Sequence, residues 1–127
     1  MTTIKNLMGL GTSGALAQAS CTGMLQNNLT ALGSSQATAL LAPSDFMVFT
    51  TVAASTGVIL PAALNGAANP GDYYTVVNHG ANSLSVYPPV GGKISTGAAN
   101  AAFAVASGKT AFLVCIDGTN WAASVSA

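Results

Sequence analysis

Hydrophobic and polar side chains alternate with a period of two in several parts of the chain. Ser83–Tyr87 alternates in this way, and Tyr73–Val77 consists entirely of aromatic and β-branched residues. Asn69–Asp72 and His79–Asn82, which flank the second of these segments, carry the proline, glycine and asparagine that favour turns. We therefore predict a β-hairpin over Asn69–Tyr87, with one face of its second strand buried and the other in water.

Similar short segments, separated by turn residues, occur on both sides of this hairpin. We predict further strands at Asn28–Leu32, Gln36–Leu41, Phe46–Val52, Val58–Leu60, Lys93–Ser95, Ala102–Val105, Thr110–Ile116 and Trp121–Val125. Both faces of Thr110–Ile116 are apolar, which is typical of a strand with neighbours on each side. Many short strands at this spacing indicate an all-β fold, an antiparallel β-sandwich or barrel of jelly-roll-like form.

The first 22 residues differ in composition from the rest. Ile4, Leu7, Met8 and Leu10 are bulky and apolar, and the glycines among and after them oppose a long helix, so only a short helix at Ser13–Ala19 is expected. We predict an extended N-terminal arm over residues 1–22 and a β-domain over residues 23–127. Exposed apolar side chains favour docking on a neighbouring subunit, and the alternative is a loose terminus.

Charged residues are scarce, because the chain holds only three lysines, three aspartates and no arginine or glutamate. They make up 5% of the sequence, against about 25% in an average soluble domain. A net charge of zero offers no basic surface for nucleic acid. No apolar run approaches the ~20 residues that span a bilayer. Weak repulsion between copies favours self-association, so we expect a homo-oligomer.

The two cysteines, Cys21 and Cys115, are far apart in sequence and lack the spacing of a metal or redox motif. We favour two free thiols over a disulfide. Ala17-Gln18-Ala19 has the small-x-small form of a signal cleavage site, but glycines interrupt the apolar stretch before it. We therefore expect no export by that route.

Groups suited to catalysis are few. His79 is the single histidine, and its neighbours Asn78 and Gly80 favour a hydrogen-bonded turn over a general base or a metal ligand. Asp72 and Asp117 adjoin turn glycines, where a carboxylate accepts backbone N–H bonds. We predict no catalytic residue, no metal site and no cofactor. A small hydrolase built around His79 is a third hypothesis.

Aromatic residues offer a second kind of site. Tyr73, Tyr74, Tyr87 and Trp121 present ring faces that suit a sugar. Strand aromatics also pack against their cross-strand neighbours, and we favour that interpretation here.

Several segments resemble small virion structural proteins of tailed bacteriophages. They are Asn6–Gly11 (NLMGLG), Thr50–Ala63 (TTVAASTGVILPAA), Pro70–Ile94 (PGDYYTVVNHGANSLSVYPPVGGKI), Ala101–Cys115 (AAFAVASGKTAFLVC) and Trp121. The resemblance is to head decoration or cement proteins and to head fibre proteins. It covers most of the chain, and Pro70–Ile94 is its most specific part.

The resemblance implies a non-enzymatic β-rich trimer that binds the major capsid protein on the outside of the head and stabilises it. Such a protein is made in the host cytoplasm and ends in the virion. The arm residues Ile4, Leu7, Met8 and Leu10 are the expected capsid anchors. The alternative is a head or tail fibre module that attaches to a host glycan through Tyr87 or Trp121.

Overall fold

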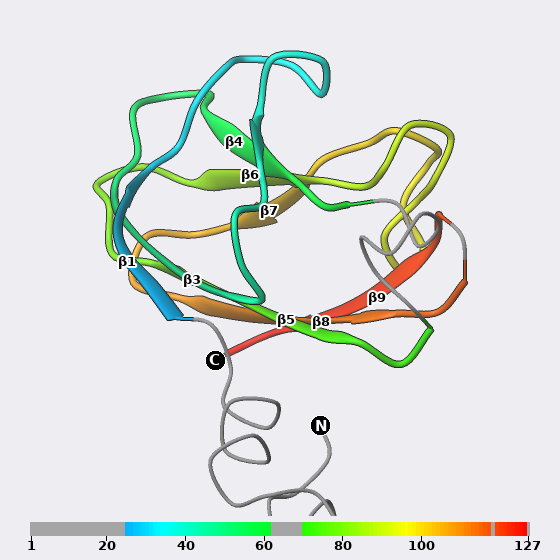
Figure 1. Cartoon of the computed structure of the whole chain (residues 1–127). Helices are drawn as coiled ribbons and strands as arrows, with labels where there is room; N and C mark the ends of the chain where they lie inside the picture. The colour runs from blue at the N-terminus through cyan, green and yellow to red at the C-terminus, as the bar shows by residue number, and fades with distance from the viewer. Residues whose placement is uncertain (1–24, 62–69, 118, 127) are drawn as a thin grey trace, which may run out of the picture.

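The structure, a computed structural model, describes residues 25–61, 70–117 and 119–126. These residues form nine β-strands and no helix (Figure 1). The strands are β1 (Leu25–Thr30), β2 (Leu40–Leu41), β3 (Phe46–Thr51), β4 (Gly57–Ile59), β5 (Tyr73–Asn78), β6 (Leu84–Tyr87), β7 (Phe103–Val105), β8 (Thr110–Cys115) and β9 (Trp121–Val125).

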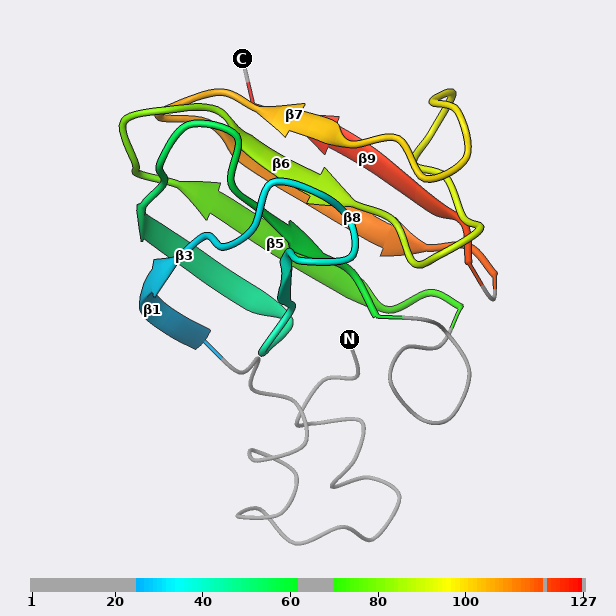
Figure 2. The same cartoon turned by 90° about the horizontal axis from the view of Figure 1, so that it is seen from above.

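The strands form two sheets that lie one above the other (Figures 1 and 2). One sheet has five strands in the order β1-β3-β5-β8-β9, and the other has four in the order β2-β4-β6-β7. From β1 to β6 the chain changes sheet after every strand. Each return adds a strand parallel to the one before it, so β1, β3 and β5 are parallel, as are β2, β4 and β6. The last three strands pair antiparallel: β7 with β6, β8 with β5, and β9 with β8.

The prediction of an all-β fold is confirmed, and the antiparallel arrangement is wrong for the first six strands. The two mixed sheets do not close into a barrel, and jelly-roll strand order is not shown. The reason is that alternation of side chains identifies a strand and its buried face but not its partner. Parallel and antiparallel neighbours leave the same pattern in the sequence.

The predicted hairpin over Asn69–Tyr87 is also wrong, although both of its strands exist. β5 pairs with β3 and β8, whereas β6 pairs with β4 and β7 in the other sheet. The segment between them, residues 79–83, is therefore an arch that carries the chain from one sheet to the other. Asn69 itself lies outside the described residues.

A buried asparagine holds this arch in place. Asn78 is fully buried, and its Nδ2 donates to the carbonyls of Asn82 and Val105, each at 2.8 Å. Its Oδ1 accepts from the N–H of Gly80 at 2.9 Å. A Cβ on Gly80 would lie 2.6 Å from the Cβ of Val52, so only glycine fits there. Because Val105 belongs to the four-stranded sheet, Asn78 links the two layers directly.

Two other predicted strands are shorter than expected. Only Leu40 and Leu41 of Gln36–Leu41 form a strand, because the Thr38 hydroxyl accepts from the N–H groups of Ser34 and Ser35 and closes a turn. Lys93–Ser95 contributes a single bridge, from Ile94 to Trp121. The predicted arm over residues 1–22 and the helix at Ser13–Ala19 lie outside the described residues.

The core lies between the two sheets and draws on both. Phe49 of β3 and Leu113 of β8 face Val58 of β4 and Val86 of β6, and all four are essentially inaccessible to water. At one end of the core the ring of Trp121 packs edge-on against Tyr74, with centroids 5.2 Å apart. Burial of both layers against one core explains why neither sheet stands alone.

Replacing Asn78 by alanine tests the role of this residue in the arch. The Asn78→Ala variant loses the Nδ2 hydrogen bonds to the Asn82 and Val105 carbonyls and the Oδ1 bond from the Gly80 N–H, so we expect a loss of about 2–4 kcal/mol in the free energy of unfolding, measured with urea. The control, Ser83→Ala at an exposed site of the same arch, should change it by less than about 0.5 kcal/mol. Equal effects of both substitutions would contradict the assignment.

Candidate functional site

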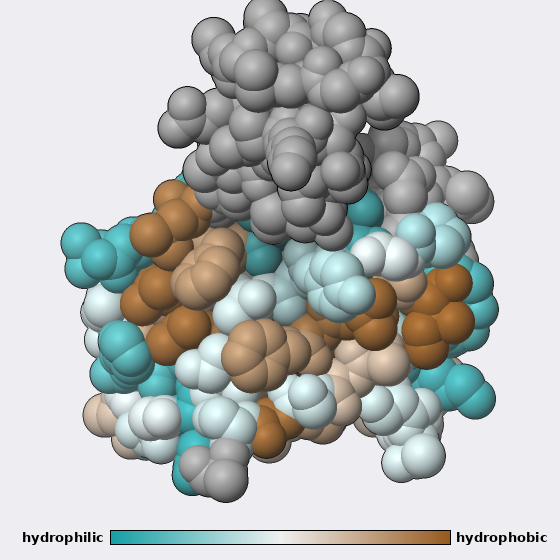
Figure 3. All heavy atoms as spheres, turned by 90° about the horizontal axis from the view of Figure 1, so that it is seen from below, coloured by the Kyte–Doolittle hydropathy of each residue, from teal (hydrophilic) through white to brown (hydrophobic). Residues whose placement is uncertain are grey.

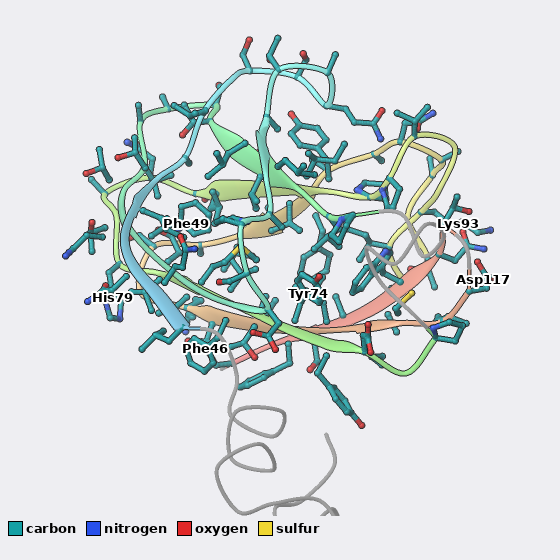
Figure 4. The ribbon with its side chains drawn as sticks, in the orientation of Figure 1. Phe46, Phe49, Tyr74, His79, Lys93 and Asp117 are labelled. Atoms are coloured by element: carbon teal, nitrogen blue, oxygen red, sulfur yellow. The ribbon has the colours of Figure 1, made fainter. Side chains whose placement is uncertain are left out.

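The residues that suggested catalysis do not come together in the structure. His79 is exposed at one end of the molecule, and Asp117 lies at the opposite end (Figure 4). In the described ranges, no three histidine, cysteine, aspartate or glutamate side chains are grouped so as to hold a metal ion. The backbone N–H of His79 donates to the Phe49 carbonyl at 2.8 Å, which continues the β3–β5 pairing to the first residue of the arch.

Asp117 has the predicted turn role. Its Oδ1 accepts from the N–H groups of Thr119 and Asn120, each at 3.1 Å, and its Oδ2 accepts from Asn120 Nδ2 at 3.0 Å. These hydrogen bonds, first the one from the Asn120 side chain, hold the pKa of the Asp117 carboxyl below its usual value. A carboxylate engaged in this way closes the turn between β8 and β9.

Cys115 is a free thiol in the core, as predicted for that residue. Burial raises the pKa of this thiol, and the negative charges of Asp72 and Asp117 raise it further. The reactive thiolate is therefore disfavoured, and Cys115 acts as a packing residue. Cys21 lies outside the described residues.

The aromatic residues divide into buried and exposed groups. Trp121 is 1% exposed and packs on Tyr74, so the expectation that Trp121 stacks on a glycan is wrong. The two rings pack on each other as the packing interpretation expects, although β8 lies between their strands. Burial, followed by the nearby charges of Asp72 and Asp45, raises the pKa of the Tyr74 phenol. Tyr73, one residue earlier, points to the opposite face and is 63% exposed.

The feature that stands out is the side of the five-stranded sheet turned away from the core, which we call the outer face. Registers place its side chains in rows across β3, β5, β8 and β9. They are Phe46, Val48, Tyr73, Thr75, Val77, Thr110, Phe112, Val114, Ala122 and Ser124. No charged side chain occupies these positions. Figure 3 views this face and shows hydrophobic and weakly polar residues across it, with the most hydrophilic ones mainly at its margin.

Large apolar side chains project from the outer face. Phe112 is 53% exposed and Phe46 is 40% exposed, and Leu25, which pairs with Phe46 at the edge strand β1, is 60% exposed. Figure 4 shows Phe46 on this side of the sheet, whereas Phe49 points between the layers. An apolar sheet face without charge is typical of a surface that another protein covers.

A shallow hollow of about 270 Å³ lies at the β8–β9 side of the outer face. Its sides include Tyr73 and Phe112, and its floor includes Val114, Ala122 and Ser124. The floor is low because alanine and serine stand beside two aromatic rings. A hollow of this kind receives an apolar side chain of a partner better than it receives a charged one.

The edges of the sheets are poorly suited to pairing with another strand. At β1, the register shifts around Asn28, whose φ of 57° marks a bulge. At β9, Trp121 N donates to the Lys93 carbonyl at 3.0 Å and Ala123 N donates to Ser95 Oγ at 2.9 Å. The edge strands of the other sheet, β2 and β7, have two and three residues. These are the devices that block edge pairing, so the outer face is the better contact surface.

Sequence reasoning identified the strands of the outer face but not the face itself. Phe46, Tyr73 and Phe112 were each assigned to strands, and their common orientation depends on the registers of β3, β5 and β8. The alternation did show that Thr110–Ile116 has two apolar faces, and this was the available signal. The predicted anchors Ile4, Leu7, Met8 and Leu10 lie outside the described residues.

Comparisons of the chain with protein-family models, with curated proteins and with solved structures found no match. The part of the chain that the structure describes also contains no helix with the length and apolar character needed to cross a membrane.

The lowered pKa of Asp117 predicts how its turn responds to pH. Because the folded-state pKa lies below the unfolded value of about 3.9, the carboxylate stabilises the fold above that value, and the effect is lost as pH falls through the folded pKa. The difference in unfolding free energy between the parent and Asp117→Ala should thus be largest at neutral pH and fall in strong acid to the smaller value that an uncharged oxygen acceptor gives. Urea titrations at several pH values measure it.

Asp117→Asn is the matched control, because its amide oxygen still accepts from the N–H groups of Thr119 and Asn120 but carries no charge. Its difference from Asp117→Ala should not vary over the same pH range. A difference between the parent and Asp117→Ala that stays constant down to strong acid would refute the role of the charge.

Proposed function

We propose that the chain is a virion structural protein, a decoration or cement protein that binds the major capsid protein lattice on the outside of a phage head. It acts as a trimer, stabilises the head and catalyses no reaction. It is made in the host cytoplasm and becomes part of the virion. The observation that carries the proposal is the uncharged outer face, with its exposed aromatic and aliphatic side chains.

The composition supports this proposal. In a decorated head, most of the surface of such a protein is covered by copies of itself and by the capsid protein. The three lysines and three aspartates of the chain are far fewer than a surface facing only water carries. The two-layered β-structure supports it too, because a rigid protein loses little conformational entropy when it binds a lattice.

The resemblance of Thr50–Ala63 and Pro70–Ile94 to phage head proteins is the second support. In the structure these segments supply β4, β5 and β6 and the arch between them. The resemblance thus concerns the central strands of both sheets. We assign the attachment itself to an N-terminal arm over residues 1–22, with Ile4, Leu7, Met8 and Leu10 as the anchors.

Attachment is tested by co-sedimentation of the full chain with heads of the encoding phage that lack this protein. Deletion of residues 2–20 should abolish sedimentation with the heads and leave a soluble β-domain. Replacing the four anchors by serine should weaken binding at least about tenfold, because each buried apolar side chain contributes roughly 1.5–3 kcal/mol. The matched control replaces four polar arm residues by alanine: Thr2, Thr3, Asn6 and Thr12. Full binding by the deletion variant would refute the arm, and no binding by the parent would refute the decoration function.

The alternative function, a head or tail fibre module for a host glycan, has one observation in its favour. Tyr73 and Phe112 stand exposed beside the hollow, and aromatic rings of this kind present large apolar faces to a ligand. This arrangement differs from the expected pair Tyr87 and Trp121, since Trp121 is buried.

A glycan array probed with the full chain separates the two functions. The fibre module predicts at least one hit that Tyr73→Ala removes and that Tyr87→Ala, a change of the same kind on the other sheet, leaves in place. An array without a hit counts against the module and leaves the decoration function as the proposal.

A further inference from the structure

The two halves of the outer face differ in relief. On the β1–β3 half, Leu25 and Phe46 project from the sheet, whereas the β8–β9 half contains the hollow, with Ala122 and Ser124 in its floor. β3 and β9 are three strand positions apart, which corresponds to about 14 Å at ~4.8 Å per strand. Phe46 therefore lies about that far from Ser124 in the floor of the hollow, at the other end of the same cross-strand row.

The hollow is large enough for an aromatic side chain. Its volume of about 270 Å³ exceeds the roughly 150 Å³ of a cavity that takes up benzene. Its sides are the rings of Tyr73 and Phe112, which favour contact with another ring. The hollow of one molecule thus suits the Phe46 ring that projects from the β1–β3 half of a second molecule.

The electrostatics of the outer face allow contact with a copy of the same chain. A surface that carries no charge meets itself without like-charge repulsion and leaves no ion buried without a partner. A nucleic acid or a strongly charged protein would find no opposite charge on it. Among the labelled charged residues, Lys93 and Asp117 lie at one end of the molecule, away from the face (Figure 4).

We propose that the outer face binds a second copy of this chain head to tail, with Phe46 of one copy seated in the hollow between Tyr73 and Phe112 of the next. A heterologous contact of this kind closes into a ring when the rotation between successive copies divides a full turn evenly, and three copies with their outer faces toward a common axis form a trimer. The inference deepens the self-association in the proposed function and does not depend on the capsid.

The dimensions of the face set the expected strength. Five strands of about six residues cover roughly 20 Å by 20 Å, less than the ~800 Å² per partner of a standard interface. Association in solution should therefore depend on concentration and be complete only near the top of the range from about 10 μM to about 1 mM. Binding to a lattice would add to it through avidity.

Sedimentation velocity of the full chain across this range tests the proposal. Phe112→Lys and Phe46→Lys each place an unpaired charge in the contact, so each should weaken association at least about 100-fold. Val90→Lys is the control, because Val90 is a 75% exposed apolar residue in the loop after β6, away from the outer face. It should associate as the parent does. Circular dichroism and thermal melts establish that each variant is folded.

A charge pair tests the head-to-tail geometry itself. Ser124→Asp alone should weaken association, and the double variant Phe46→Lys/Ser124→Asp should restore it, since each contact then joins opposite charges from two copies. The ~14 Å between the two positions prevents the pair from forming within one chain. A double variant that associates no better than either single variant would refute the seating of Phe46 in the hollow.

Other occupants of the face give different results. If residues 1–24 of the same chain cover it, the parent stays monomeric up to about 1 mM and the lysine variants do not alter its mass, which overturns the proposal. A two-fold contact appears as a dimer, which overturns the ring. Association through this face without attachment to heads would refute the decoration function alone. Attachment as a monomer would refute the present inference and the trimer of the proposed function, and would leave capsid binding in place.

Discussion

The fold depends on the way in which the chain turns from one sheet to the other. The segments that follow β1, β3 and β5 are arches that lead to the other sheet, and neighbouring arches hydrogen-bond to one another. Ala31 N, after β1, donates to the Thr51 carbonyl at the end of β3, and Asn82 Nδ2, after β5, donates to the Val52 carbonyl after β3. Asn78 completes the set by joining β5 to the Val105 carbonyl of the other sheet. Because every arch satisfies polar groups of the next one, the two layers keep a fixed register and share one core.

The same constraint fixes what faces outward. Once Met47, Phe49, Val76 and Leu113 point into the core, the period of two turns Phe46, Val48, Val77 and Phe112 toward the outside. These strands are therefore apolar on both sides. One side is buried by the second sheet, and the other is buried by nothing in the part of the chain that the structure describes. This imbalance is the physical basis for assigning the function to contacts.

The sequence predicted the strands well and their partners poorly. Local alternation and turn residues located β3, β5, β6, β8 and β9 closely, because these signals act over a few residues. The arch at His79–Ser83 looked like a hairpin turn, since the acceptor that distinguishes the two, the Val105 carbonyl, lies far along the chain. The sequence left Trp121 open as a glycan-binding residue, whereas the structure places it in the core. Its burial depends on Tyr74, which lies far away in the sequence. The outer face needed registers that no local pattern contains.

The alternation between layers has a consequence for how the chain reaches this structure. In the first six strands, each strand finds its sheet neighbour only after the chain has made an intervening strand for the other layer. Local hairpins cannot nucleate this part, so folding waits for non-local closure and is expected to be slow for a domain of this size. Until β8 pairs with β5, the apolar edge of β5 stays open to other chains. The order of events then matters: each molecule must finish its own sheets before it meets its neighbours.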